Sequence, residues 1–228
     1  MILSSAYLAP VHYYTKLYSS ALAQVPVIEE RADHYVKQTY RNRCIIAGDD
    51  GPIALTIPVS APPLPCRGSL SKTPTGEVLI SDHGDWRHQH WQAIVSAYRS
   101  SPYFEYYADD FERVFHDETA LLVDFNAALR DLVLDCLDLH PIIQVNTEHY
   151  LDASLHEAEG ELHDYRETIR PKIPYTFDPT FRPATYWQVF ASRHGFLPNL
   201  SIIDLLFNMG PESRLVLRNS IADAAHWA

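Results

Sequence analysis

A short run of basic residues carries the strongest chemical signal in the sequence. A strand over this run would place Lys37, Arg41 and Arg43 on one face together with Thr39. Two guanidinium groups can donate paired hydrogen bonds to a phosphate or a carboxylate, and Asn42 lies between them in the sequence. The run predicts a binding site for an anionic small-molecule substrate. The alternative is an exposed strand face whose charges pair with nearby acids.

His90 is the candidate for acid–base chemistry. It belongs to a segment rich in histidine and tryptophan, and on a helix it shares a face with Trp86, Ala93 and Ala97. This spacing predicts that His90 points toward the core. A partly buried imidazole can exchange a proton near neutral pH, so we take His90 as a candidate catalytic base. The alternative is a hydrogen-bonded histidine with a structural role.

Asp204 is the second candidate catalytic residue. Ser201, Asp204 and Asn208 form a polar stripe on an otherwise apolar helix predicted over residues 200–208. A buried carboxylate without a partner costs several kcal/mol, so Asp204 should meet a cation or a donor, with Arg41 or Arg43 as the cation. The alternative is an exposed stripe on an ordinary amphipathic surface helix.

Three further residues complete the predicted substrate site. His12 follows the first predicted strand, where parallel sheets present their ligands. Asn199 is a suitable N-cap for the helix over 200–208, and Ser201 begins its polar stripe. We expect all three to contact substrate.

Other chemistries lack the residues that they need. His83, His88 and His90 lack the spacing of a zinc motif, so we expect no metal site. The sequence has no glycine-rich phosphate loop, no nucleophile elbow and no convincing Cys-His pair. Covalent catalysis is therefore unsupported, and the sequence leaves the cofactor unknown.

The order of elements predicts an α/β fold. Residues 2–8 and 25–28 are predicted as strands, and the apolar spacing of residues 11–23 predicts a helix between them. This is the βαβ unit that opens a central parallel sheet. A turn-rich segment over 48–52 separates two β-prone runs, which predicts an inserted hairpin.

The rest of the chain is predicted as a helical middle and a long connector within one domain over residues 1–228. Further strands are predicted at 78–81 and 142–145, and helices at 85–100, 102–115, 121–137, 186–194 and 200–208. The proline-rich residues 60–76 are predicted as a mobile loop. Residues 148–183 are acidic and then proline-rich, which predicts a solvated connector without a core of its own.

Composition limits the partners and the compartment. The 228 residues carry a net charge of -11 and are 46% apolar, which is typical of a globular protein that repels nucleic acid and anionic membranes. No apolar run is long enough to span a bilayer. Three cysteines without paired spacing suggest a reducing compartment, so we expect a cytoplasmic protein. The sequence leaves homo-oligomerisation open.

Several segments together resemble the WbqC-like protein family, a bacterial group linked to genes for surface-polysaccharide synthesis, especially O-antigen. The resemblance rests on segments 7–10, 40–43, 57–59, 86–90, 97–98, 101–105 and 196–210, which read YLAP, YRNR, IPV, WRHQH, AY, SPYFE and FLPNLSIIDLLFNMG. The first loop, residues 5–10, lacks the glutamine found in longer relatives. Residues 146–195 look compressed, which suggests a shortened branch of the family.

The resemblance implies a role in lipopolysaccharide synthesis. It suggests transfer of a sugar, an acyl group or an aminoacyl group of the glycine type. With the residues above, it predicts a cytosolic transferase in which Arg41 and Arg43 hold an anionic donor, His90 acts as base and Asp204 orients a partner. The alternative is a non-catalytic ligand-binding or assembly protein whose partner surface is aromatic, formed by Tyr103, Phe104, Tyr106 and Tyr107.

Overall fold

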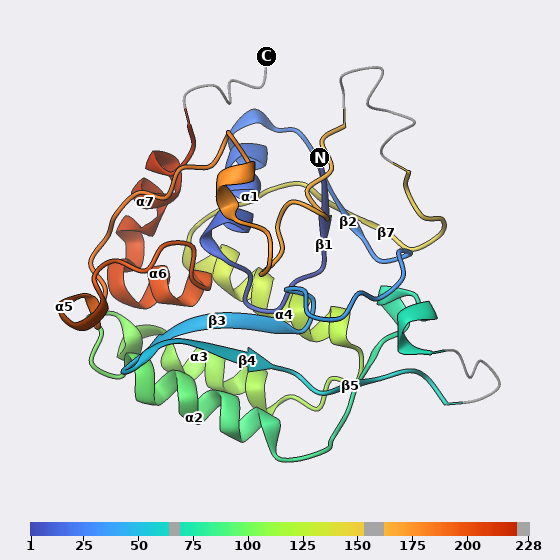
Figure 1. The fold of residues 1–228 in the computed structure, drawn as a ribbon, viewed down its shortest axis with the longest axis horizontal. Helices are drawn as coiled ribbons and strands as arrows, with labels where there is room; N and C mark the ends of the chain where they lie inside the picture. Colours follow the sequence, from blue (N-terminus) through green and yellow to red (C-terminus); the bar gives the residue numbers. More distant parts are fainter. Residues whose placement is uncertain (64–68, 153–161, 223–228) are drawn as a thin grey trace.

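A three-stranded parallel sheet organises the protein. The structure is a computed structural model that describes residues 1–63, 69–152 and 162–222. The strands β1 (Ile2–Ser4), β2 (Val27–Glu30) and β7 (Ile143–Asn146) are arranged in the order β1-β2-β7 (Figure 1). Ile28 pairs with Ile2 on one side and with Gln144 on the other. The predicted single-domain α/β fold is confirmed.

The opening βαβ unit has the predicted helix but shorter strands. Helix α1 (Val11–Ala23) has the predicted bounds and ends at Gln24, which adopts a left-handed conformation. The first strand ends at Ser4 because the chain then turns over the sheet edge, with Leu8 at a φ of 40°. The Tyr7 backbone N–H donates to the carbonyl of Tyr40 at 2.8 Å. This contact joins the end of β1 to the segment that precedes the hairpin.

The predicted hairpin is present, but its first strand begins later than the basic run. Strand β3 (Arg43–Gly48) pairs with β4 (Gly51–Thr56) in antiparallel register. Residues 37–42 form turns, with Gln38 at a φ of 60°. The predicted strand face of cations is therefore wrong, because a chain in consecutive turns does not alternate its side chains between two faces.

Two very short strands, β5 (Val59–Ser60) and β6 (Leu79–Ile80), form a second antiparallel pair. Between them lie the 3₁₀ helices η1 (Leu70–Lys72) and η2 (Thr75–Glu77). Residues 64–68 of the predicted loop lie outside the described residues, so its mobility stays a prediction.

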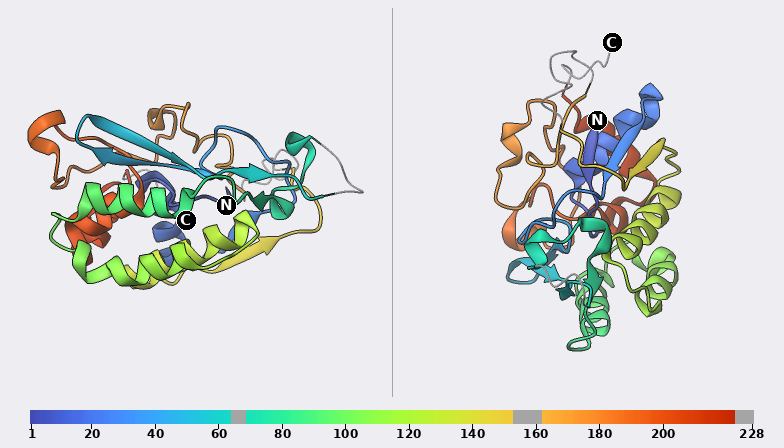
Figure 2. Two further views of the ribbon diagram at one scale, coloured as in Figure 1. Left: turned by 90° about the horizontal axis from the view of Figure 1, so that it is seen from below. Right: turned by 90° about the vertical axis from the view of Figure 1, so that its right-hand side faces the viewer.

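Helices α2, α3 and α4 form the helical middle. Their bounds are Trp86–Tyr98, Phe104–His116 and Leu122–Cys136, close to those predicted. Figure 2 shows α2 against one side of the β3–β4 hairpin, and α3 packs on α2. Aromatic rings join this layer to the C-terminal helices: Phe207 lies 5.2 Å from Phe104 and 5.3 Å from Phe111, measured between ring centroids.

The C-terminal part contains α5 (Ala191–His194), α6 (Ile202–Met209), the 3₁₀ helix η6 (Gly210–Glu212) and α7 (Ser213–Asn219). The N-cap of α6 is Ser201, so the predicted cap at Asn199 is wrong. Asn199 has a φ of 56°, and its side-chain oxygen accepts the backbone N–H of His12 at 2.9 Å. Asn199 therefore caps the first turn of α1, which Pro10 cannot cap with a side chain.

The connector is less solvated than predicted. Its residues 163–165 run beside β1, where the Ile2 N–H donates to the His163 carbonyl and the Tyr165 N–H donates to the Ile2 carbonyl. Tyr165 and Ile169 are buried in the core. The acidic residues hid this packing, because the sequence alone does not show which of the apolar side chains among them face β1. Residues 153–161 lie outside the described part.

In the described residues, no helix combines the length and the apolar character needed to cross a membrane.

Candidate functional site

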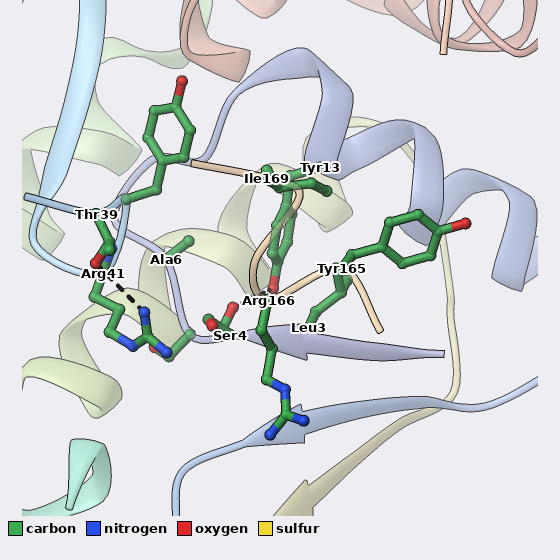
Figure 3. Close-up of a pocket in the computed structure, with 11 residues that line it drawn as sticks. Leu3, Ser4, Ala6, Tyr13, Thr39, Arg41, Tyr165, Arg166 and Ile169 are labelled. Carbon is green, nitrogen blue, oxygen red and sulfur yellow. Dashed lines mark hydrogen bonds between the residues drawn. The ribbon is translucent and has the colours of Figure 1, made fainter. Parts of the chain in front are cut away.

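The candidate site is a small cavity at the carboxyl end of the parallel sheet, the usual position of ligands in open α/β folds. We call it the carboxyl-edge cavity. It is lined by Leu3, Ser4, Ser5, Ala6, Tyr13, Thr39, Tyr40, Arg41, Tyr165, Arg166 and Ile169. The cavity has room for about one water molecule, since the centre of a water-sized sphere can move within about 10 Å³. Figure 3 shows Ser4 between the two arginines.

Arg41 is the one cation of the predicted basic run that lines the cavity. Its side chain is 2% exposed, and its Nη2 pairs with Oδ2 of Asp33. Its Nη1 donates weakly to Thr39 Oγ1 at 3.4 Å, and its carbonyl accepts the side-chain amide of Asn126 at 2.8 Å. The turns over residues 37–42 therefore aim Arg41 inward. One nitrogen, Nε, has no hydrogen-bond partner.

Arg166 enters from the connector and was not predicted. Its Nε and Nη2 contact the carboxylate of Asp164 at 2.6–3.0 Å, and Nη2 also donates to the Leu151 carbonyl at 2.7 Å. Its Nη1 lies 3.6 Å from Oε2 of Glu30, the last residue of β2, and has no hydrogen bond. The available sequence signal was a single arginine within the otherwise acidic residues 148–167.

Unmet hydrogen-bonding capacity concentrates here. In the described parts of the chain, eight buried side-chain atoms lack a partner. Three of them line the cavity, namely Ser4 Oγ, Arg41 Nε and Arg166 Nη1. Two more, Asp33 Oδ1 and Asn126 Oδ1, belong to residues that contact the lining. Because buried polar groups are normally paired, this concentration makes the cavity the candidate functional site.

The other members of the basic run have different surroundings. Arg43 donates through Nε to Thr56 Oγ1 on the neighbouring strand at 3.0 Å. The Asn42 amide donates to the Ile57 carbonyl at 2.8 Å and so fixes the end of the hairpin. Lys37 lies in a turn and is exposed. None of the three lines the carboxyl-edge cavity.

Asp204 is completely buried, at 0% exposed, and lies in a separate cluster of neutral donors. Its Oδ1 accepts from the Tyr98 hydroxyl at 2.9 Å, and its Oδ2 accepts from Tyr186 at 2.6 Å and from Gln188 at 2.8 Å. Burial raises the pKa of Asp204, and these hydrogen bonds oppose the rise. In the described residues no cation pairs with Asp204, so its predicted contact with Arg41 or Arg43 is wrong. The expectation that it meets donors is confirmed.

The rest of the predicted polar stripe is also buried. Ser201 Oγ donates to the Leu8 carbonyl at 2.7 Å, and the Asn208 amide donates to the Asp204 carbonyl at 2.7 Å. The exposed-stripe alternative is therefore wrong. Ser201 holds the turn after β1 against α6, which positions the end of that strand.

His90 faces the core, as predicted. It is 7% exposed, and its Nδ1 lies 3.0 Å from the Tyr7 hydroxyl. Burial lowers its pKa to about 4, so the ring is neutral at physiological pH. His90 does not line the carboxyl-edge cavity. The convergence that we expected, with Arg41, His90 and Asp204 around one cavity, is not found.

His12 belongs to a third cluster, which ties α1 to the connector. Its Nε2 lies 2.6 Å from Asp178 Oδ2, and Lys16 Nζ lies 2.5 Å from the same oxygen. Lys16 also donates to Thr180 Oγ1 at 2.6 Å. Burial lowers the pKa of His12. Burial alone would raise the pKa of Asp178, but hydrogen bonds from His12, Lys16 and Thr180 hold it well below its usual range. The ring of Phe181 stacks on His12 at 4.3 Å.

The predicted aromatic partner surface is mostly core. Phe104 and Tyr107 are buried, Tyr103 packs partly against the core, and only Tyr106 is exposed, at 79%. The four side chains therefore do not form one exposed patch. Within the described residues, no group of three or more His, Cys, Asp or Glu side chains could hold a metal ion.

The fold and the cavity define a mixed α/β domain with its candidate ligand site at the carboxyl end of a parallel sheet. The chain belongs to the WbqC-like protein family, whose family model matches residues 6–216. This match covers β2 and β7 of the sheet, the hairpin, the helical middle and α6. The comparisons with curated proteins and with solved structures gave no significant match.

Proposed function

We propose that this protein is a cytosolic transferase that acts on an anionic activated sugar, acyl or aminoacyl donor in bacterial surface-polysaccharide synthesis, and that one group of its substrate enters the carboxyl-edge cavity. The observation that carries the proposal is the group of unpartnered buried atoms on Ser4, Asp33, Arg41, Asn126 and Arg166. Buried polar atoms are normally paired, so a bound polar group at this place would complete these atoms.

In this proposal Arg41 and Ser4 bind substrate. Asp33 and Asn126 hold Arg41 in place, through its guanidinium and its carbonyl respectively. His90, Asp204 and the His12 cluster stabilise the framework around the cavity, because their hydrogen bonds are made within the protein. The two residues first considered catalytic thus become positioning residues.

A ligand screen tests the proposal. Nucleotide sugars, acyl-CoA thioesters and aminoacyl donors are added separately, and the melting temperature is measured. We expect one donor class to raise the melting temperature, because a ligand at 100 times its Kd stabilises the folded state by about 2.7 kcal/mol.

Two variants locate the site. Arg41→Lys keeps a positive charge opposite Asp33 but removes the unpartnered Nε–H, so it should lose most of the ligand-induced shift. Arg43→Ala is the matched control, since its guanidinium faces Thr56 and not the cavity. Unchanged binding in Arg41→Lys, or no response of the wild-type protein to any donor class, would contradict the proposal.

Transfer is separated from binding by product analysis. The donor class that binds is incubated with candidate polysaccharide acceptors, and the products are separated by mass. A transferred group is expected with the wild-type protein and is lost with Arg41→Lys. Binding without any product would favour the alternative of a non-catalytic ligand-binding protein.

A further inference from the structure

The charges around the carboxyl-edge cavity are already balanced. The two guanidinium groups, Arg41 and Arg166, pair with or approach three carboxylates, Asp33, Asp164 and Glu30. These five side chains together therefore carry a formal charge of -1. A phosphate or carboxylate entering here would find no positive charge without a partner, and an uncompensated buried charge is costly.

The size of the cavity gives an independent constraint. The cavity, at about 10 Å³, admits a group as large as one water molecule. A phosphoryl group carries several oxygens around its phosphorus and needs more room. A single hydroxyl group fits without displacement of the lining side chains.

The unpartnered atoms give the third constraint, because they include donors and acceptors. On the lining, Arg41 Nε and Arg166 Nη1 can only donate and Ser4 Oγ can donate or accept; Asp33 Oδ1 and Asn126 Oδ1, on residues that contact the lining, accept. Arg41 and Asp33 form an ion pair, yet each keeps one atom without a partner: the donor Arg41 Nε and the acceptor Asp33 Oδ1. A hydroxyl group both donates and accepts, a phosphate dianion only accepts, and an ammonium only donates.

We infer that the group received by the carboxyl-edge cavity is an uncharged hydroxyl of a polyol-like substrate. This rests on the proposed function, and it specifies which part of the substrate this cavity contacts. The hydroxyl donates to Asp33 Oδ1 and accepts from Arg41 Nε, with Ser4 Oγ as a further partner. Any phosphate or carboxylate of the donor lies outside the cavity.

The experiment compares a neutral and an anionic probe. Methyl glycosides and inorganic phosphate are titrated separately into the wild-type protein, and binding is followed through the NMR signal of the Arg41 Nε–H and through the melting temperature. Methyl glycosides should shift that signal and raise the melting temperature. Phosphate should do neither beyond the effect of matched ionic strength.

Two variants sharpen the result. Asp33→Asn exchanges a charged acceptor for a neutral amide, and Ser4→Ala removes an unpartnered hydroxyl, so each should weaken glycoside binding about five- to tenfold. Ser4→Ala breaks no hydrogen bond of the free protein and keeps the test valid if Asp33→Asn folds poorly.

The inference would be overturned if phosphate, and not a glycoside, shifted the Arg41 Nε–H signal. It would also be overturned if glycosides bound equally well to the Ser4→Ala variant, or failed to bind while a donor bound in an Arg41-dependent way. Different results would contradict the proposed function: no donor class binds, or a donor binds equally well to the Arg41→Lys variant.

Discussion

Asp204 and Asp33 are both buried carboxylates, but their hydrogen bonding differs. Both oxygens of Asp204 accept hydrogen bonds from the neutral donors Tyr98, Tyr186 and Gln188. Asp33 pairs with Arg41 through one oxygen, and its other oxygen has no partner. Complete pairing is what a structural residue needs, whereas incomplete pairing leaves capacity for a ligand. The comparison agrees with the proposed function, in which Asp204 belongs to the framework and Asp33 to the site.

The largest effect is expected at Asp204. Asp204→Ala leaves two tyrosine hydroxyls and one amide without their acceptor, so it should lower the free energy of unfolding by roughly 3 kcal/mol or more. Urea unfolding measures this loss. Asp204→Asn keeps an acceptor oxygen and should cost less. A loss below about 1 kcal/mol in Asp204→Ala would break the comparison.

The next effect concerns His90 and pH. Its pKa is lowered by burial to about 4, against about 6.5 in an unfolded chain. The unfolded state therefore binds the proton more readily, and stability is lost as pH falls from about 6.5 to about 4. The full loss is on the order of 3 kcal/mol.

Unfolding curves for wild type and His90→Gln across this pH range isolate that contribution, since His12 and other groups titrate in both proteins. The variant should show the shallower decline. Parallel pH profiles in the two proteins would mean that the His90 ring reaches water and is not part of the buried framework.

A smaller effect is expected at Ser5, which lines the cavity but is already hydrogen-bonded. Ser5 Oγ accepts from the Asn126 side-chain amide at 3.1 Å. Ser5→Ala should therefore lower the free energy of unfolding by about 1 kcal/mol, as measured with urea. An unchanged free energy of unfolding would mean that the hydrogen bond to Ser5 Oγ contributes nothing, and that paired and unpartnered residues of the cavity do not differ.

Much of the fold could be predicted from the sequence. The apolar spacing of residues 11–23 and of residues 121–137 located α1 and α4 almost to the residue, because an amphipathic helix displays its period locally. The hairpin followed from the glycines at 48 and 51. The packing of Tyr165 against the core could not be predicted, because it depends on a contact with β1 more than 160 residues earlier.

The site was only partly predictable. Arg41 was found from its charge in an acidic chain, but the strand geometry assigned to it was wrong, and Arg43 points elsewhere. Ser4 and Arg166, which line the cavity, were not predicted. A serine becomes notable only when its hydroxyl is buried and unpartnered, and the sequence does not show that. Asp204 looked catalytic because its three neutral donors come from distant segments.

Substitution of Ser4 tests the central claim most directly, because Ser4 and Ser5 are neighbours that line the same cavity and differ in pairing. Donor binding and urea unfolding are measured for wild type, Ser4→Ala and Ser5→Ala. We predict that Ser4→Ala keeps the wild-type free energy of unfolding, or slightly exceeds it, and loses about five- to tenfold in donor affinity. A destabilised Ser4→Ala protein that binds donor as tightly as wild type would contradict the account.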